Sequence, residues 1–279
     1  MAEQKMFRFN KGKPQMAQLP IAAFAPTADW LADGKHTIVC EPELSNACAH
    51  VFYWFTKTQE YLETRDPSLL YVDGHPVTAP LVAYSIVLQG LLIRAGHVEA
   101  DPGQPWLGIE GWDDKVKEWE EKKKAAGGNP TSVRTLPVRW ARYDLIPWED
   151  LKPTARLYEV GAIKYARGNY RNKQDNLLTN VMDPCFRHLT DLSAFIRGGC
   201  LDRSLLIDPE NRLPYCSQVA WNSVCVQMHL LIEGLIYPVP NKIDLTPSGI
   251  ALSPAYRQPG WSGIGITGQP ITTLVLKNT

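Results

Sequence analysis

The stretch of this chain that is richest in reactive side chains spans residues 159–173 and reads EVGAIKYARGNYRNK. Its first residue, Glu159, can ligate a divalent cation, and its basic residues can neutralise phosphate oxygens, arginine in a bidentate manner. Asn169 and Tyr170 can read a base or stack on it. The stretch therefore predicts contacts with a nucleotide; the alternative is a solvated helix face. The basic residues are Lys164, Arg167, Arg171 and Lys173.

Polar side chains that could complete such a site follow downstream. They are Asp183, Arg187, His188, Asp191, Asp208, Glu210 and Asn222. Helical bundles build sites for hard cations from carboxylates on several facing helices, so these acids predict a Mg²⁺ or Mn²⁺ site suited to nucleotide phosphates. Such a site requires that Glu159 be reached by at least two of Asp191, Asp202, Asp208 and Glu210. For His188, a purely structural role is the alternative.

The elements that must position these residues are helices. Apolar residues recur at helical spacing, and Pro153 stands where a first helical turn tolerates it, after Glu149 and Asp150. We expect helices over 24–33, 47–64, 77–95, 155–166, 184–197 and 219–236, and hence an all-α fold. The helix over 184–197 is expected to bury one face, formed by Phe186, Leu189, Leu192 and Phe195 or Ile196.

Similar segments occur in the same order in the two halves of the chain. The paired segments are Pro26-Thr27-Ala28 with Pro153-Thr154-Ala155, His50 with His188, Asp66-x-Ser68 with Asp202-x-Ser204, Pro76 with Pro214, and Val82-Ala83 with Val219-Ala220. Taken together, they predict a tandem duplication of a helical unit of about 80–90 residues that forms a helical bundle. The alternative is a coincidence among common helix-starting and apolar residues.

The duplication predicts four regions along the chain. They are a degenerate first copy at 1–97, a charged linker at 98–140, a second copy with the candidate active site at 141–237, and an irregular Pro/Gly-rich tail at 238–279. The linker is expected to hold a solvated connecting helix rather than a partner-binding arm, with Trp106, Trp112 and Trp119 available to dock it. The tail could join subunits into a homo-oligomer or wrap over its own domain.

Composition restricts the classes of partner. The 279 residues include 29 basic and 29 acidic side chains, so no general electrostatic field favours nucleic acid or a membrane. The apolar run at 81–93 is too short to span a bilayer, and the start of the chain lacks the apolar region of a signal peptide. The six cysteines form no C-x-x-C pair, which favours reduced thiols without zinc. We therefore expect a cytoplasmic protein that binds neither nucleic acid nor membranes.

Three segments together carry a resemblance to a known family. RYDLIPWEDLKPTARLYEVGAIKYARGNYR, DPCFRHL and DPENRLPYCSQVAWN resemble the phage-type dATP/dGTP diphosphohydrolases, which belong to the all-α, MazG-like nucleoside triphosphate pyrophosphohydrolases. The resemblance covers residues 142–232. It implies Mg²⁺-assisted attack of water on the α-phosphorus of a (deoxy)purine nucleoside triphosphate, which gives the monophosphate and pyrophosphate.

The resemblance also implies roles for single residues. The catalytic residues would be Glu159, His188 and Asp208. The substrate would be bound by Lys164, Asn169, Tyr170, Arg171, Arg187 and Asn222. The ligands of Mg²⁺ or Mn²⁺ would be Glu159, Asp183, Asp208 and Glu210.

The sequence departs from the family pattern in two places. Arg197-Gly198-Gly199-Cys200 stands where the family has an acidic loop, and Tyr215-Cys216-Ser217-Gln218 stands where it has two histidines. These departures favour a second hypothesis, a catalytically inactive descendant that serves as a nucleotide-binding or regulatory module or as a phage structural protein. The enzyme hypothesis implies the host cytoplasm if the protein is phage-encoded, and the structural hypothesis implies the virion.

Overall fold

The computed structural model describes residues 12–33, 43–125, 127, 141–172 and 174–236. All of these residues lie in one compact unit. The predicted tail and its part in oligomer formation lie outside the described residues, as do Cys40 and Lys173.

The described residues are mainly helical, so the predicted all-α class is confirmed. The α-helices are α1 (Ala25–Ala32), α2 (Leu44–Thr64), α3 (Thr78–Arg94), α4 (Trp112–Ala125), α5 (Lys152–Lys164), α6 (Asp183–Arg197) and α7 (Tyr215–Ile232). Two-residue strands β1 (Tyr71–Val72) and β2 (His75–Pro76) pair in antiparallel fashion. The 3-10 turns are η1 (Met16–Gln18), η2 (Ile21–Phe24), η4 (Pro67–Leu69), η5 (Pro105–Gly108), η6 (Tyr143–Leu145), η7 (Trp148–Leu151), η8 (Asn169–Arg171) and η10 (Arg203–Leu205), and η9 (Leu178–Met182) is a π-helical turn.

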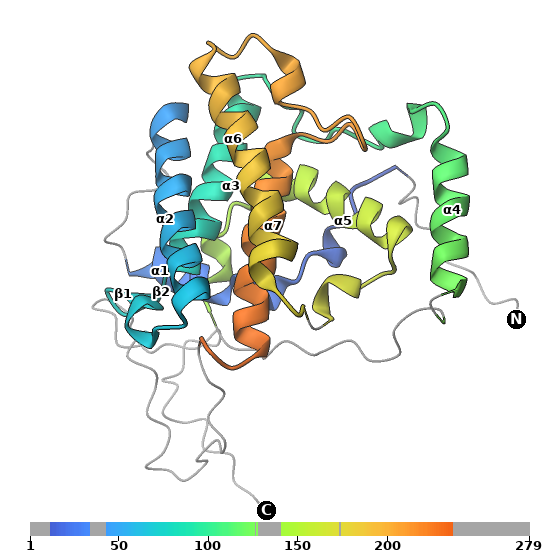
Figure 1. Cartoon of the computed structure of the whole chain (residues 1–279). Helices are drawn as coiled ribbons and strands as arrows, with labels where there is room; N and C mark the ends of the chain where they lie inside the picture. Colours follow the sequence, from blue (N-terminus) through green and yellow to red (C-terminus); the bar gives the residue numbers. More distant parts are fainter. Residues whose placement is uncertain (1–11, 34–42, 126, 128–140, 173, 237–279) are drawn as a thin grey trace, which may run out of the picture. The chain divides into compact units, whose positions relative to one another are not determined.

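Helices α2, α3, α6 and α7 stand side by side as a bundle (Figure 1). α3 and α7 pack against each other at its centre, α2 and α6 pack on them, and α1 and α5 cross the flanks on α3 and α7. The central helices are apolar on nearly every side, which suits burial all round. In α6 the expected face is confirmed for Leu189, Leu192 and Phe195. The expectation for Phe186 is wrong: it is 49% exposed, because Cys185 takes the inward position and Phe186 lies at the edge against α2.

Two regions of this unit contain the same order of elements, and we call them the first half (16–96) and the second half (143–234). Each runs through two 3-10 turns, a helix that contains Pro-Thr-Ala, a long helix, a 3-10 turn, a short antiparallel pairing and a final helix. The second half has in addition η8 and η9 between α5 and α6, whereas residues 34–42 of the first half lie outside the described residues. The turn before each pairing begins with an aspartate that accepts a hydrogen bond from a serine N–H. The two bonds are Ser68 to Asp66 at 2.9 Å and Ser204 to Asp202 at 3.0 Å.

The central contact between α3 and α7 joins corresponding residues of the two halves. The hydroxyl oxygens of Ser85 and Ser223 lie 3.0 Å apart. The two serines occupy similar places on the final helices of the two halves. Aligning them sets Val82 against Ala220, one position away from the predicted pairing of Val82 with Val219.

Further hydrogen bonds between the halves are reciprocal. On α3, Gln89 donates to two groups at the start of α5, and on α7, Gln227 donates to two groups at the start of α1. The acceptors are the Asp150 carbonyl and the Thr154 hydroxyl for Gln89, and the Ala23 carbonyl and the Thr27 hydroxyl for Gln227. Each half therefore holds the first helix of the other in the same way.

The charged helix α4 docks on α5 through a second apolar cluster. Trp106 and Trp112 are buried there with Val160 and Leu213, and Trp119 packs against them. The predicted docking through three tryptophans is confirmed. The rest of α4 is charged and largely exposed, with ion pairs along its own surface.

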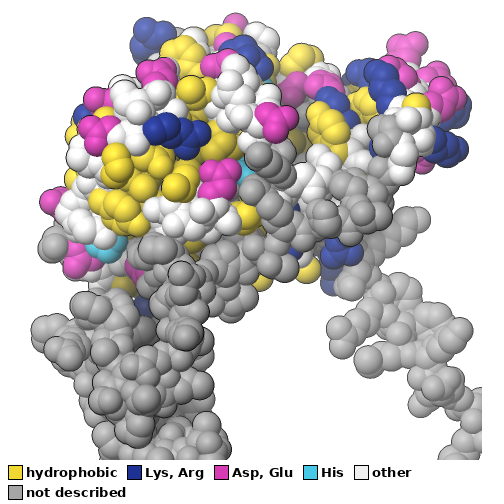
Figure 2. All heavy atoms as spheres, turned by 60° about the horizontal axis from the view of Figure 1, so that its bottom comes forward, with side chains coloured by type: hydrophobic (Ala, Val, Ile, Leu, Met, Phe, Trp, Pro, Cys, Tyr) yellow, Lys and Arg dark blue, Asp and Glu magenta, His cyan; other side chains and the backbone are white. Residues whose placement is uncertain are grey.

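The surface combines apolar and charged side chains of both signs. Figure 2 shows the face that lies at the bottom of Figure 1, where apolar side chains gather among scattered basic and acidic ones. Within the described residues, no helix combines the length and the apolar character needed to cross a membrane. The described cysteines are Cys48, Cys185, Cys200, Cys216 and Cys225, and none of these five is paired with another.

Candidate active site

Two adjoining cavities lie along helix α5 in the second half. The first, of about 440 Å³, is lined mainly by aromatic and amide side chains, and we call it the aromatic cavity. The second, of about 230 Å³, has charged, amide and imidazole groups in its wall, and we call it the polar cavity. The two share a wall formed by Gly161, Tyr165, Asn180 and Trp221. A Cβ added at Gly161 would meet no atom within 4 Å, so bare backbone faces open space there.

The aromatic cavity offers flat rings and polar edges. The ring of Tyr158 on α5 lies 4.8 Å from that of Tyr170 and 5.9 Å from that of Trp221, centroid to centroid. The amide side chains in its wall are those of Asn169, Gln174 and Asn180. Such a wall suits a flat heteroaromatic ring, because rings stack on its faces and amides can hydrogen-bond its edge.

The turn after α5 brings the predicted base-binding residues into this wall. Gly168 has a φ of 80°, a left-handed conformation that favours glycine, and it starts the turn that carries Asn169 and Tyr170. The Tyr170 hydroxyl donates to the Gln18 carbonyl at 2.9 Å, which ties the turn to the first half. Arg171 lies with its guanidinium carbon 5.5 Å from the centroid of the Tyr170 ring, and it is not part of either cavity wall.

Lys164, at the last residue of α5, supplies the positive charge of the polar cavity. Its Nζ lies 2.7 Å from Glu210 Oε1 and 5.5 Å from the centroid of the Trp119 ring. Burial opposes the charged form, but the hydrogen bonds and charges of Glu210 and Tyr165 together outweigh it and raise the pKa of Lys164. Because Glu210 is exposed, this pair is open to solvent, where an anionic ligand can compete for the ammonium group.

Asp208, in the wall of the polar cavity, holds the loop that follows α6. It is 8% exposed and accepts hydrogen bonds from the Glu210 N–H at 2.7 Å, from Asn211 Nδ2 at 2.8 Å and from Gln218 Nε2. All three donors are neutral, so the cavity wall keeps the negative charge of this carboxylate.

His188 on α6 lies in the same wall and stacks on Tyr215, with ring centroids 4.9 Å apart. Burial lowers the pKa of His188, and the charge of Asp208 opposes part of that effect. The imidazole is therefore mostly neutral at pH 7 and can accept a proton there.

The remaining predicted residues divide into two groups. Asn222 lies in the polar wall, is 4% exposed and donates to the Gln218 carbonyl at 2.8 Å. Asp183 and Arg187 are exposed on α6 and belong to neither wall. The fold thus gathers Lys164, His188, Asp208, Glu210 and Asn222 around one cavity and Asn169 and Tyr170 around the other.

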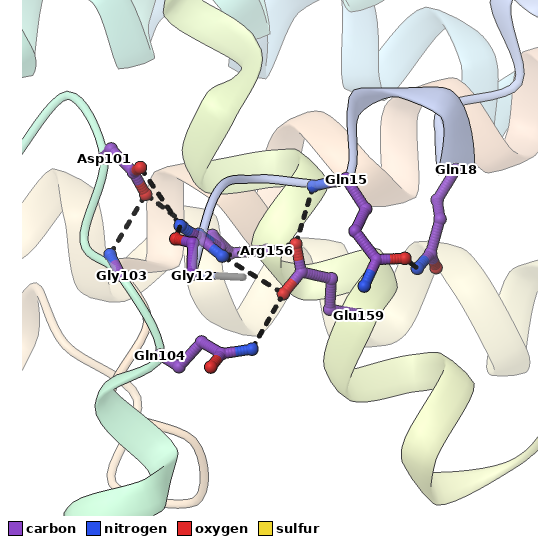
Figure 3. A network of polar contacts seen from close by, with 8 residues as sticks. All are labelled: Gly12, Gln15, Gln18, Asp101, Gly103, Gln104, Arg156 and Glu159. Carbon is purple, nitrogen blue, oxygen red and sulfur yellow. Dashed lines mark hydrogen bonds and ion pairs between the residues drawn. The ribbon is translucent and has the colours of Figure 1, made fainter. Parts of the chain in front are cut away.

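Glu159 lies on a different face of α5 from these cavities and has its own set of partners (Figure 3). It is 4% exposed and accepts hydrogen bonds from the Gln15 N–H at 2.7 Å and from Gln104 Nε2 at 3.4 Å. The guanidinium of Arg156, one turn earlier, lies 3.2 Å from Glu159 Oε2. The carboxylate is therefore already engaged by a cation and two neutral donors.

Arg156 joins Glu159 to a second carboxylate. Its side chain is completely buried and binds Asp101 in a bidentate manner at 2.8 and 3.0 Å, and it also donates to the Gly12 carbonyl. The hydrogen bonds from Arg156 lower the pKa of Asp101, although burial opposes them. We call Asp101, Arg156 and Glu159 the buried charge cluster.

The carboxylates do not fit a common cage for a metal ion. Across the described ranges, no group of three or more histidine, cysteine, aspartate or glutamate side chains is gathered so that it could hold one. The side chains of Asp191, Asp202, Asp208 and Glu210 accordingly do not complete a site around Glu159, and Asp183 lies exposed on α6.

Five residues of the cavity walls and the buried charge cluster were not predicted from the sequence. They are Arg156, Tyr165, Asn180, Gln218 and Trp221. For Arg156 a signal was present, because a basic residue three positions before Glu159 stands in an otherwise apolar helical stretch and can pair with it. The other four carry no local signal, since only the packing of α5, η9 and α7 brings them to one wall.

A comparison with known protein families found a match, and it covers the second half of the chain. Residues 135–235 match the model of the dATP/dGTP diphosphohydrolase N-terminal domain. The search of curated proteins found no match, and the search of solved structures found none either. The resemblance predicted from the sequence is confirmed over this segment.

Proposed function

We propose that the two adjoining cavities bind a (deoxy)purine nucleoside triphosphate and hydrolyse it to the monophosphate and pyrophosphate, because residues 135–235 match the model of the dATP/dGTP diphosphohydrolase N-terminal domain. One observation carries the proposal: every residue that lines either cavity lies between 157 and 222, inside the matched segment. The aromatic cavity would take the base, and the polar cavity would take the phosphates.

The base assignment rests on the rings of Tyr158, Tyr170 and Trp221. A purine between or against such rings gains stacking energy of about 1–3 kcal/mol. The amides of Asn169 and Asn180 can donate to and accept from its edge, which a hydrocarbon wall cannot do.

The phosphate assignment rests on Lys164. Its partner Glu210 is exposed, so a phosphate oxygen can replace the carboxylate at modest cost. Asn222 adds a side-chain amide to the same wall. Arg171 and Arg187 lie outside both walls, and we assign them a weaker, long-range attraction for the phosphates.

The reaction forms a bond between a water oxygen and the α-phosphorus and breaks the bond from the α-phosphorus to the bridging oxygen. Pyrophosphate leaves with that electron pair. The neutral imidazole of His188 can accept the proton from the attacking water, and the charge of Asp208 stabilises the imidazolium that results. Lys164 neutralises charge on the leaving pyrophosphate.

The nucleotide itself is expected to bring Mg²⁺ or Mn²⁺ as part of the substrate. These cations bind nucleotide phosphates and commonly keep several waters, so a dedicated cage of protein carboxylates is not required for them to enter. Glu210 at the mouth of the polar cavity is the nearest candidate for a contact with such a substrate-borne ion, because its carboxylate is exposed.

A second candidate function is nucleotide binding without hydrolysis. The observation that favours it is the engagement of Glu159 in the buried charge cluster, which takes one predicted catalytic and metal-binding group out of the cavities. In that case the protein would be a regulatory module or a structural component of a virion.

We also propose that the two halves arose by tandem duplication of a MazG-like helical unit. The shared order of elements and the reciprocal bonds of Gln89 and Gln227 support this proposal. Fusion of two copies would keep the partner of each half permanently present, so that one half could lose its site and still pack.

Chromatography of the products formed from a panel of deoxy- and ribonucleoside triphosphates, with Mg²⁺ or Mn²⁺, tests the function. We expect purine monophosphate and pyrophosphate, with at least tenfold slower turnover for Lys164→Ala. Lys57→Ala is the matched control, since Lys57 on α2 also pairs with a glutamate and lies in neither cavity wall. Binding without turnover would favour the second candidate, and absence of binding would overturn both.

A further inference from the structure

The buried charge cluster has the composition of a cation-binding site. Oxygen atoms from three separate segments converge on the guanidinium of Arg156 (Figure 3). They are the carboxylate of Asp101 in the linker, the carboxylate of Glu159 on α5 and the carbonyl of Gly12. Carboxylate and backbone carbonyl oxygens are the groups with which proteins bind hard cations.

The cluster holds two negative charges and one positive charge. The side chain of Arg156 is 0% exposed and that of Glu159 is 4% exposed, whereas that of Asp101 is 35% exposed. Removing the cation would leave the buried carboxylate of Glu159 with two neutral donors and no counter-charge, which is unfavourable. The positive charge of Arg156 therefore stabilises the contact between the N-terminal segment, the linker and α5.

We propose that this cluster is a cation site whose permanent occupant is the guanidinium of Arg156, and that Glu159 serves as a ligand of this internal cation rather than of a catalytic metal. Arg156 is then a positioning residue. It fixes the helix whose other faces line both cavities, because it joins that helix to the Gly12 carbonyl and to Asp101. Its partner Glu159 adds hydrogen bonds from Gln15 and Gln104. The proposal concerns the cluster alone and does not depend on nucleotide hydrolysis.

The first test asks whether a guanidinium ion from solution can take the place of the Arg156 side chain. Arg156→Ala leaves space for one guanidinium ion, so 20 mM guanidinium or methylguanidinium should raise the melting temperature of this variant by several degrees, which about ten dissociation constants of ligand would achieve. Urea has a similar shape but no charge and should not do so. Wild type should show no such gain, and neither should Arg142→Ala, which removes an exposed arginine with the same bidentate carboxylate contact.

The second test asks whether the vacated site accepts a different cation. Tb³⁺ should bind Arg156→Ala and give saturable, tryptophan-sensitised emission beyond that of wild type. The added substitution Glu159→Gln should weaken this binding at least tenfold, because it removes one ligand charge. Arg142→Ala should again behave as wild type.

A third comparison keeps the proposal testable if Arg156→Ala does not fold. Arg156→Lys retains a positive charge, and Arg156→Met fills similar space without one. We expect the yield of soluble protein and the melting temperature to fall in the order wild type, lysine, methionine. The proposal is overturned if the methionine variant equals wild type, or if a folded Arg156→Ala responds to guanidinium no more than to urea and gains no Tb³⁺ binding.

Discussion

The two halves of the molecule differ in their aromatic packing at the place where the second half has its polar cavity. When Thr27 is aligned with Thr154, Trp30 of α1 falls on Leu157 of α5, which lines that cavity. Trp30 is 3% exposed, so the first half buries a large ring where the second half presents a smaller side chain beside open space.

The final helices show the same difference. When Ser85 is aligned with Ser223, Tyr84 falls on Asn222, another residue of the polar wall. The rings of Trp30 and Tyr84 lie 5.9 Å apart, and His50 stacks on Tyr84 at 4.3 Å. The first half thus has packed aromatic rings at the positions where the second half has a cavity. The same order of elements can form either a packed core or a cavity, and the two cases differ in side-chain volume at these two positions.

The largest effect is expected when the second half is given the side chains of the first. Leu157→Trp combined with Asn222→Tyr should fill the polar cavity and weaken nucleotide binding at least a hundredfold, which is about 2.7 kcal/mol. Titration calorimetry with dATP and dGTP measures this, and circular dichroism checks that the variant folds. A folded variant with unchanged affinity would show that nucleotides bind elsewhere.

The converse change should affect stability and leave nucleotide binding in place. Trp30→Leu combined with Tyr84→Asn removes one buried and one partly buried ring from the first half and should lower the free energy of unfolding by about 2 kcal/mol, as large-to-small core substitutions do. Urea unfolding measures the loss. If dGTP affinity fell in parallel in the still-folded variant, the division of labour between the halves would be refuted.

Several features of the fold could be predicted from local signals. Apolar residues at helical spacing and Pro-Thr-Ala at two helix starts predicted α1, α2, α3, α5, α6 and α7 to within a few residues, although α7 begins earlier and ends earlier than expected. The paired segments Asp66-x-Ser68 and Asp202-x-Ser204 both begin 3-10 turns. The hydrogen bonds of Gln89 and Gln227 could not be predicted, because they depend on the tertiary contact between the halves.

Part of the candidate site could also be predicted from the sequence. Lys164, Asn169, His188 and Asn222 reach the cavities because they lie on elements that the sequence pattern indicates. The direction of Glu159 depends on partners far away in the chain, at Gln15, Asp101 and Gln104, and on the charge of Arg156. No local pattern encodes such contacts.

A smaller loss of stability is expected when the hydrogen bonds between the halves are removed on one side at a time. Gln89→Leu and Gln227→Leu each leave a carbonyl and a threonine hydroxyl in the other half without their amide donor, so each should cost about 1–3 kcal/mol of unfolding free energy. Chemical denaturation of both variants measures the two costs. Costs that differ by more than 2 kcal/mol would argue against an equivalent role for these bonds in the two halves.

The smallest effect concerns pH and is confined to the second half. Because burial lowers the pKa of His188, the unfolded chain binds this proton more tightly, and stability falls as the pH drops below about 6.5. The charges of Asp208 and Asp191 reduce the effect, and that of Arg187 adds to it. His188→Gln should therefore lose less stability than wild type between pH 7.5 and 5.5 in urea unfolding. Equal losses would contradict this assignment.

Hydrogen exchange with and without dGTP tests most directly the claim that the second half holds the nucleotide site. The account predicts slower exchange on binding in residues 157–170 and 208–222, with the corresponding segments of the first half, 30–33 and 70–84, unchanged. Protection confined to the first half, or no protection at saturating dGTP, would contradict it.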